Sequence, residues 1–63
     1  MPSDETRRVL KVFGVAVTAF EDAIEAGAPV EEVDGAAAEV DHRLREITAL
    51  VDRLRVASRT SRG

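Results

Sequence analysis

The sequence has 63 residues, a formal net charge of −3, one histidine and no cysteine. A chain this short forms at most one small domain with a marginal core, so such proteins usually gain stability from disulfides, a metal or self-association. The absence of cysteine excludes disulfides and thiolate metal sites, and a single histidine excludes an imidazole-rich site within one chain. We therefore expect self-association, with no metal and no other cofactor.

The composition is typical of a folded helical chain. Apolar residues make up 44% of the sequence, aromatic residues only 3%, and a third of all residues are charged. No apolar run approaches the roughly 18 residues that a membrane span needs. The first residues, MPSDETRRVL, lack the basic-then-apolar layout of a signal peptide. These features predict a cytoplasmic protein that does not bind membranes.

A first helix is predicted over residues 4–26, approximately. Ser3 is its expected N-cap, and the acidic residues that follow suit the positive end of a helix. Gly14, in the middle, either admits another backbone at close range or is simply tolerated. The apolar residues recur at intervals of three and four, as in the seam of a packed helix: Leu10, Phe13, Val17, Phe20 and Ile24. A second stripe widens this face: Val9, Val12, Ala16, Ala19 and Ala23.

The segment AGAP, residues 26–29, is predicted to end this helix and to reverse the chain. Gly27 suits the left-handed conformation of a helix C-cap, and Pro29 suits the first turn of a following helix. We predict one continuous second helix over residues 29–58, approximately, although Asp34-Gly35 is a point where it could restart. Residues 59–63 form a polar tail that should fray. The second helix continues the same spacing: Val30, Val33, Ala37, Val40, Leu44, Ile47, Val51 and Leu54.

The predicted architecture is a single all-α domain, residues 1–63, folded as an antiparallel two-helix hairpin. Its apolar faces are wider than two helices can cover, and the second helix should extend past the first. A homodimer of hairpins that forms a four-helix bundle would cover both. The residues expected in the core or interface are Leu10, Phe13, Val17, Phe20, Ile24, Val33, Val40, Leu44, Ile47, Val51 and Leu54.

Charge is sorted along the predicted hairpin. A basic end, where the chain termini meet, comprises Arg7, Arg8, Lys11, Arg53, Arg55, Arg59 and Arg62. An acidic end, at the turn, comprises Glu21, Asp22, Glu25, Glu31, Glu32, Asp34, Glu39 and Asp41. In one interpretation the two ends pair between copies and fix their orientation. In the other, the basic end binds phosphate on nucleic acid, through Arg7, Arg8, Lys11, Arg53, Arg55 and Arg59. No aromatic residue lies among these arginines, so base stacking is not offered.

The stretch EVDHRLREI, residues 39–47, contains the single histidine, His42. Glu-x-x-His is a ligand pair of di-iron helical bundles, but at about 100° per residue His42 lies opposite the apolar seam. The His-Arg pair also resembles the phosphoacceptor helix of some sensor histidine kinases, although the asparagine expected after it is missing. We favour a surface role, in which ion pairs Glu39–Arg43 and Asp41–Arg45 flank the histidine.

No catalytic, cofactor-binding or metal-binding residues are predicted, because the hydroxyls are mostly terminal or lie on helix faces without a nearby base, and the glycines are scattered. Gly27, Val30, Glu31 and Glu32 loosely match a turn in the small subunit of exodeoxyribonuclease VII, a helical hairpin that binds a larger catalytic subunit. The later aromatic-Glu and cysteine features of that family are absent. The expected function is a non-enzymatic oligomerisation or adaptor module, or a small accessory subunit of a larger protein. The alternative is a nucleic-acid-binding regulatory hairpin that uses the basic end.

Overall fold

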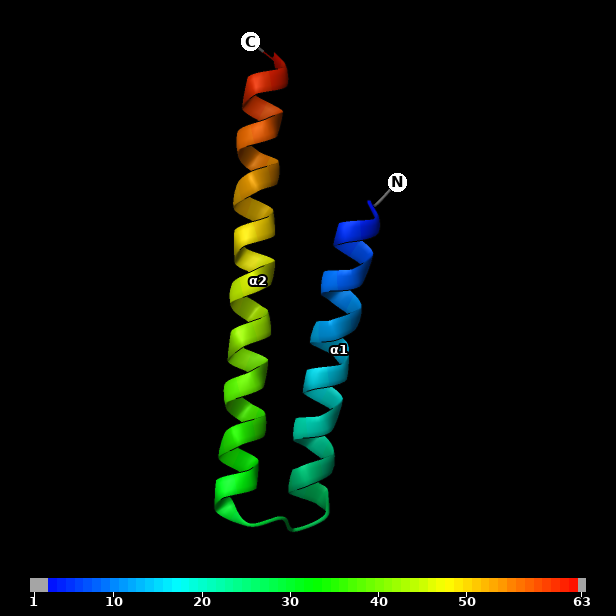
Figure 1. Ribbon diagram of the computed structural model, residues 1–63, viewed down its shortest axis with the longest axis vertical. Helices are drawn as coiled ribbons and strands as arrows, with labels where there is room; N and C mark the ends of the chain where they lie inside the picture. Colours follow the sequence, from blue (N-terminus) through cyan, green and yellow to red (C-terminus); the bar gives the residue numbers. More distant parts are fainter. Residues whose placement is uncertain (1–2, 63) are drawn as a thin grey trace.

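The chain forms two helices that pack side by side as an antiparallel hairpin (Figure 1). The computed structural model describes residues 3–62, with side chains for residues 3–59. Helix α1 spans Asp4–Glu25 and helix α2 spans Val30–Arg62, and the described residues contain no strand. The backbone measures 52 × 19 × 11 Å along its principal axes. The predicted all-α hairpin is confirmed.

Helix α1 begins where the sequence predicts. The Ser3 hydroxyl oxygen accepts a hydrogen bond of 3.1 Å from the backbone N–H of Thr6, and the Ser3 carbonyl accepts one from Arg7. The Ser3 hydroxyl thereby satisfies one of the N–H groups that have no partner within the helix, and the Ser3 carbonyl accepts the first backbone bond of the helix. Asp4 and Glu5 occupy the first turn, where negative charge opposes the positive end of the helix dipole.

The turn is held by a glycine-dependent C-cap. Gly27 has a φ of +67°, the left-handed conformation that the sequence predicts. The N–H of Ala28 donates to the carbonyl of Ala23 over 3.0 Å, and the N–H of Gly27 donates to Ile24 over 3.1 Å. This pair of bonds is the Schellman motif, which satisfies the last carbonyls of α1 and turns the chain back.

Helix α2 is continuous through Asp34 and Gly35, as predicted, but its ends differ from the prediction. The Pro29 carbonyl accepts hydrogen bonds from Glu32 and Val33, so Pro29 precedes the helix instead of lying in its first turn. At the other end the helix continues to Arg62, beyond the predicted end at residue 58. No glycine or proline interrupts residues 57–62, so nothing in this segment ends the helix. The tail predicted to fray is residues 59–63: the backbone of 59–62 is helical, and residue 63 lies outside the described part.

The line of contact between the helices runs through small residues. Ala16, Ala23 and Leu50 are the buried apolar residues of the described chain. Ala16 and Ala23 belong to the second stripe of α1, and Leu50 lies outside the predicted seam of α2. The contact line is therefore rotated from the predicted seam, because alanines at a spacing of seven allow the two backbones to approach closely.

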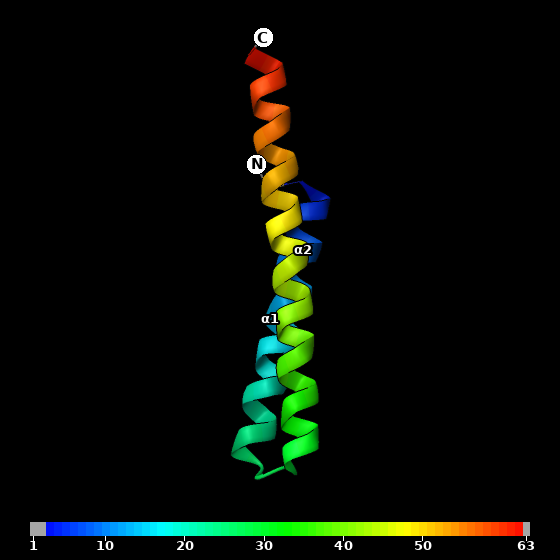
Figure 2. The ribbon, with the colours of Figure 1, turned by 90° about the vertical axis from the view of Figure 1, so that its left-hand side faces the viewer.

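The hairpin is a single layer. Seen along its edge, α1 and α2 overlap, and no third element of residues 3–62 lies over either broad side (Figure 2). Helix α2 also extends beyond the start of α1 (Figure 1). We call this extension, residues 54–62, the overhang; at about 1.5 Å per residue it is roughly 13 Å long. Both broad sides and the overhang are thus uncovered in the lone chain.

Candidate functional site

Large apolar side chains remain exposed along both helices. On α1 the exposed fraction is 53% for Leu10, 38% for Val17 and 54% for Ile24. On α2 it is 47% for Leu44 and 41% for Val51. Single exposed apolar residues are ordinary on protein surfaces, so their arrangement, and not their number, decides whether they form a site.

The arrangement places these residues on one broad side of the hairpin. Leu10, Val17 and Ile24 are seven residues apart and lie about a quarter turn around α1 from its contact with α2. Leu44 and Val51 are also seven residues apart. They lie about a quarter turn around α2 from its contact with α1, in the same rotational direction when each helix is viewed from its N-terminus. Because the helices are antiparallel, equal rotations in the same sense point to the same side. We call this surface the apolar side.

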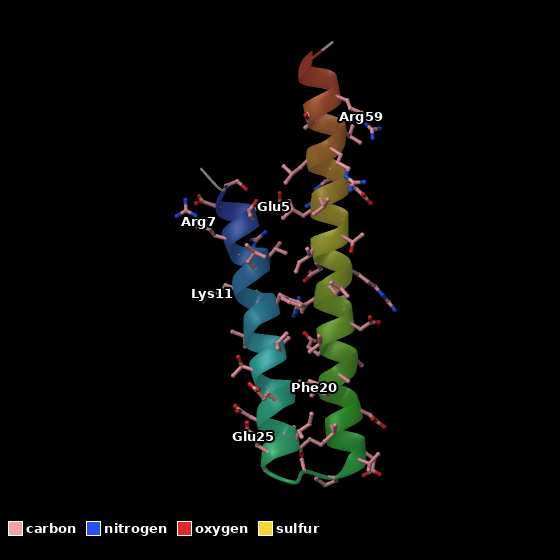
Figure 3. The ribbon with its side chains drawn as sticks, turned by 180° about the vertical axis from the view of Figure 1, so that it is seen from behind. Glu5, Arg7, Lys11, Phe20, Glu25 and Arg59 are labelled. Carbon is pink, nitrogen blue, oxygen red and sulfur yellow. The ribbon has the colours of Figure 1, made fainter. Side chains whose placement is uncertain are left out.

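The remaining predicted core residues border the apolar side. Phe13, Phe20, Val33, Val40 and Ile47 are half-buried along the groove between the helices. Figure 3 shows Phe20 on the side of α1 that faces α2, whereas Arg7, Lys11 and Glu25 point outward. Leu54 lies on the overhang with 53% of its surface exposed. The predicted core set is therefore gathered at one surface of the hairpin, and its role as an interface remains a prediction.

The opposite broad side is charged. A shallow hollow there is lined by residues of both helices: Glu5, Arg8, Val9, Val12, Arg43, Glu46, Ala49 and Arg53. Arg43 organises its centre. Arg43 Nη1 donates a hydrogen bond of 2.9 Å to Oε1 of Glu46, and Arg43 Nε lies 2.8 Å from Oε2 of Glu39 without forming a hydrogen bond. Sequence analysis predicted the Glu39 pair but missed Glu46, although a spacing of three indicates it.

These contacts change the acid–base properties of both partners. The hydrogen bond from Arg43 holds the pKa of Glu46 below its ordinary value, and the positive charges of Arg43 and Arg8 act in the same direction. The hydrogen bond to Glu46 and the nearby Glu39 charge raise the pKa of Arg43. Both groups are therefore charged at neutral pH and form a fixed ion pair on the charged side.

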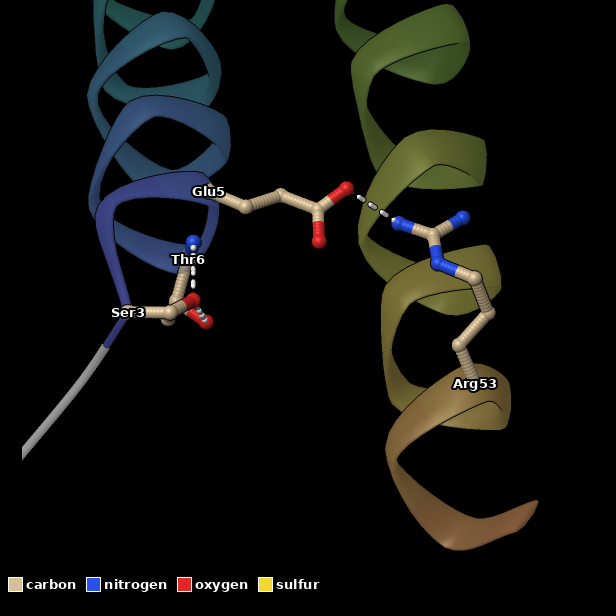
Figure 4. Close-up of polar contacts among 4 residues, drawn as sticks. All are labelled: Ser3, Glu5, Thr6 and Arg53. Atoms are coloured by element: carbon tan, nitrogen blue, oxygen red, sulfur yellow. Dashed lines mark hydrogen bonds and ion pairs between the residues drawn. The ribbon is translucent and has the colours of Figure 1, made fainter. Parts of the chain in front are cut away.

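One ion pair joins the two helices at the open end. Arg53 Nη2 lies 2.7 Å from Oε2 of Glu5, at the level where α1 begins (Figure 4). This contact was not predicted, because partners 48 positions apart in the sequence give no local pattern. It fixes the register of the hairpin at the end opposite the turn. Both side chains are about half exposed, so its contribution to stability is small.

The residues of the predicted anion-binding set do not converge on one place. Arg8 and Arg53 line the hollow on the charged side, Arg55 and Arg59 lie on the overhang, and Lys11 is on the outer side of α1. Two of the basic residues also contact carboxylates: Arg53 contacts Glu5, and Arg7 lies 3.6 Å from Asp4. The structure thus distributes this set over three parts of the surface.

His42 is exposed on α2, and the two predicted ion pairs beside it are present. Glu39 lies 2.8 Å from Arg43, and Asp41 lies 3.0 Å from Arg45. Among the described side chains, no three of His, Asp or Glu are grouped closely enough to share a metal ion. The Glu39 carboxylate pairs with Arg43 and not with His42.

Comparisons with protein-family models, curated proteins and solved structures found no match for this chain. In the described part of the chain, neither helix has an apolar stretch of the length that crossing a bilayer requires. The candidate site is thus defined by the chain's own geometry, as an apolar side on a thin hairpin with sorted charge.

Proposed function

We propose that this protein is a non-enzymatic association module whose apolar side packs against the same side of a second copy, so that two hairpins form a four-helix bundle. The observation that supports this proposal is the alignment of Leu10, Val17 and Ile24 with Leu44 and Val51 on one surface. Apolar residues at intervals of three and four on paired helices are the usual contact residues of such bundles.

The total surface of the chain supports the same proposal. A compact protein of 6.8 kDa is expected to expose about 4,000 Å², from the scaling of surface with mass. The hairpin exposes 4983 Å². The excess of about 1,000 Å² is close to the area of about 800 Å² that each partner buries in a typical stable interface. A second hairpin that packs on the apolar side would therefore bury about as much surface as this excess.

Sedimentation equilibrium with a matched pair of substitutions tests the proposal. Val17→Lys places a charge on the apolar side, and Val15→Lys places the same charge on an exposed position, with 62% of Val15 accessible, that faces away from it. Burying an unpaired charge opposes association strongly. We expect the natural chain and Val15→Lys to sediment as dimers and Val17→Lys as a monomer.

If the natural chain sediments as a monomer at every concentration, self-association is wrong. The apolar side would then be assigned to a helix of a larger protein, for which this chain would act as an accessory subunit. If Val17→Lys and Val15→Lys both remain dimeric, copies associate through another surface and the apolar side is not the interface.

A further inference from the structure

We infer that the two copies pack antiparallel, with the start of the overhang of each copy, at Leu54 and Arg55, meeting the acidic end of the other. This inference rests on the proposed self-association and adds the orientation of the copies to it. Three features of the described chain carry it: the position of the exposed apolar residues, the spacing of α2, and the distribution of charge.

The overhang is an uncovered continuation of the apolar side. Leu54 is 53% exposed and lines a shallow hollow with Val51, Arg55, Ser58 and Arg59. At the other end of α2, Val30 is 69% exposed beside the turn. A partner that covers only the middle of the hairpin leaves both ends of this apolar line in water. An antiparallel partner covers both at once, because Leu54 at the start of its overhang reaches Val30 beside the turn.

The spacing of α2 is the same in both directions. Its apolar residues are separated by 3, 4, 3, 4, 3, 4 and 3 positions from Val30 to Leu54. A two-fold axis level with residue 42 therefore places Val30 opposite Leu54 of the second copy and Val40 opposite Leu44. Each apolar residue of α2 between Val30 and Leu54 therefore lies opposite an apolar residue of the second copy. A two-fold interface, in which both copies use the same surface, requires such a self-complementary pattern.

Charge selects this orientation over the parallel one. In a parallel pair, Arg55 and Arg59 of one overhang lie beside the same arginines of the other. In the antiparallel pair Arg55 lies level with the turn of the other copy and Arg59 lies about 6 Å beyond it. The nearest charged residues of the other copy are then the exposed Glu25, Glu31 and Glu32. Opposite charges in contact favour one orientation and like charges disfavour the other, even where the net gain in affinity is modest.

Spin labels distinguish the two orientations. The chain has no cysteine, so Val56→Cys provides a single labelling site on an exposed part of the overhang, turned away from the apolar side. In the antiparallel dimer two such sites lie 14 residues on either side of the axis, about 42 Å apart along the bundle. In a parallel dimer they lie at the same level, separated only by the width of the bundle, about 20 to 25 Å. Dipolar electron spin resonance measures this distance.

Charge reversal gives an independent test. Arg55→Glu combined with Arg59→Glu is expected to weaken self-association about tenfold at low salt, because each dimer contains the contact twice. Mixing this variant with Glu31→Lys/Glu32→Lys should restore association as a heterodimer. Arg45→Glu, in the middle of α2 and exposed beside Asp41, is the matched control and should leave the affinity unchanged.

The outcomes separate the two proposals. A dimer with a label distance near 20 Å, or with an affinity that charge reversal does not change, overturns the antiparallel arrangement and leaves self-association standing. A labelled chain that sediments as a monomer overturns self-association itself.

Discussion

Arg43 is the residue that gives the charged side its order. It lies between Glu39 and Glu46 on the same helix, at distances of 2.8 and 2.9 Å. Its side chain is 29% exposed, less than the other arginines that form ion pairs. The guanidinium therefore fills space between the helices as well as carrying charge, which is a common use of the long arginine side chain. A lysine in this position would lose the two-sided geometry.

The lowered pKa of Glu46 predicts a loss of stability in acid. Because the folded pKa lies below the unfolded value of about 4.3, the contribution is complete above that value and is lost as the pH falls through the folded pKa. Glu46→Gln should flatten this part of the dependence of unfolding free energy on pH. Urea unfolding between about pH 6 and 3 measures it.

The control is Glu21→Gln, on the outer side of α1, which should leave the decrease in unfolding free energy at low pH unchanged. A decrease that is the same in the natural chain and in Glu46→Gln would show that the Arg43 contact does not bias folding.

The capping elements are the part of the fold that the sequence predicts best. Ser3 at the start of α1 and Gly27 at its end were both identified, because caps depend on local residue types and on backbone geometry. The end of α2 was placed four residues too early. Polar residues such as those at 58–62 are weak helix formers, but only glycine or proline stops a helix decisively, and neither occurs there.

Substitution of the glycines is expected to have opposite effects at different positions. At Gly27 the φ of +67° is unfavourable for a residue with a Cβ, so Gly27→Ala should destabilise the hairpin by about 1–2 kcal/mol. At Gly14, mid-helix in α1, a Cβ meets nothing within 4 Å, so Gly14→Ala should stabilise it by about 1 kcal/mol. Chemical denaturation of both variants measures the two changes.

The result at Gly14 also tests whether another backbone approaches it. A loss of stability in Gly14→Ala that grows with protein concentration would place a second copy against the outer side of α1, and not on the apolar side. A stable Gly27→Ala variant would mean that the turn reaches another conformation at little cost.

At the scale of the whole molecule, the apolar pattern predicted which residues gather together but not which of them touch within one chain. Each helix carries a face wide enough for two contacts, and periodicity alone does not divide it between them. Ala16 and Ala23 form the contact of α1 because small residues allow closer packing than Leu10 or Val17 does, and Leu50 is the large side chain of α2 that packs against them. The ion pair between Glu5 and Arg53 could not be predicted from the sequence either, because it depends on the register of the two helices, which the sequence does not specify.

Some apolar residues are buried within one hairpin and others are exposed on the apolar side. Substitutions in the two groups should therefore affect stability differently as protein concentration changes. Leu50 is 5% exposed within the hairpin, so Leu50→Ala removes a contact that exists in the single chain and should cost about 2–5 kcal/mol at any concentration. Leu44 is 47% exposed, so Leu44→Ala should cost little in the dilute single chain and much more when the copies are associated. Thermal unfolding followed by circular dichroism over about a hundredfold range of protein concentration distinguishes the two. The melting temperature of the natural chain should rise over this range, and the difference between the natural chain and Leu44→Ala should widen with it. If that difference is constant, Leu44 contributes only within its own chain, and the apolar side is not covered by a second copy.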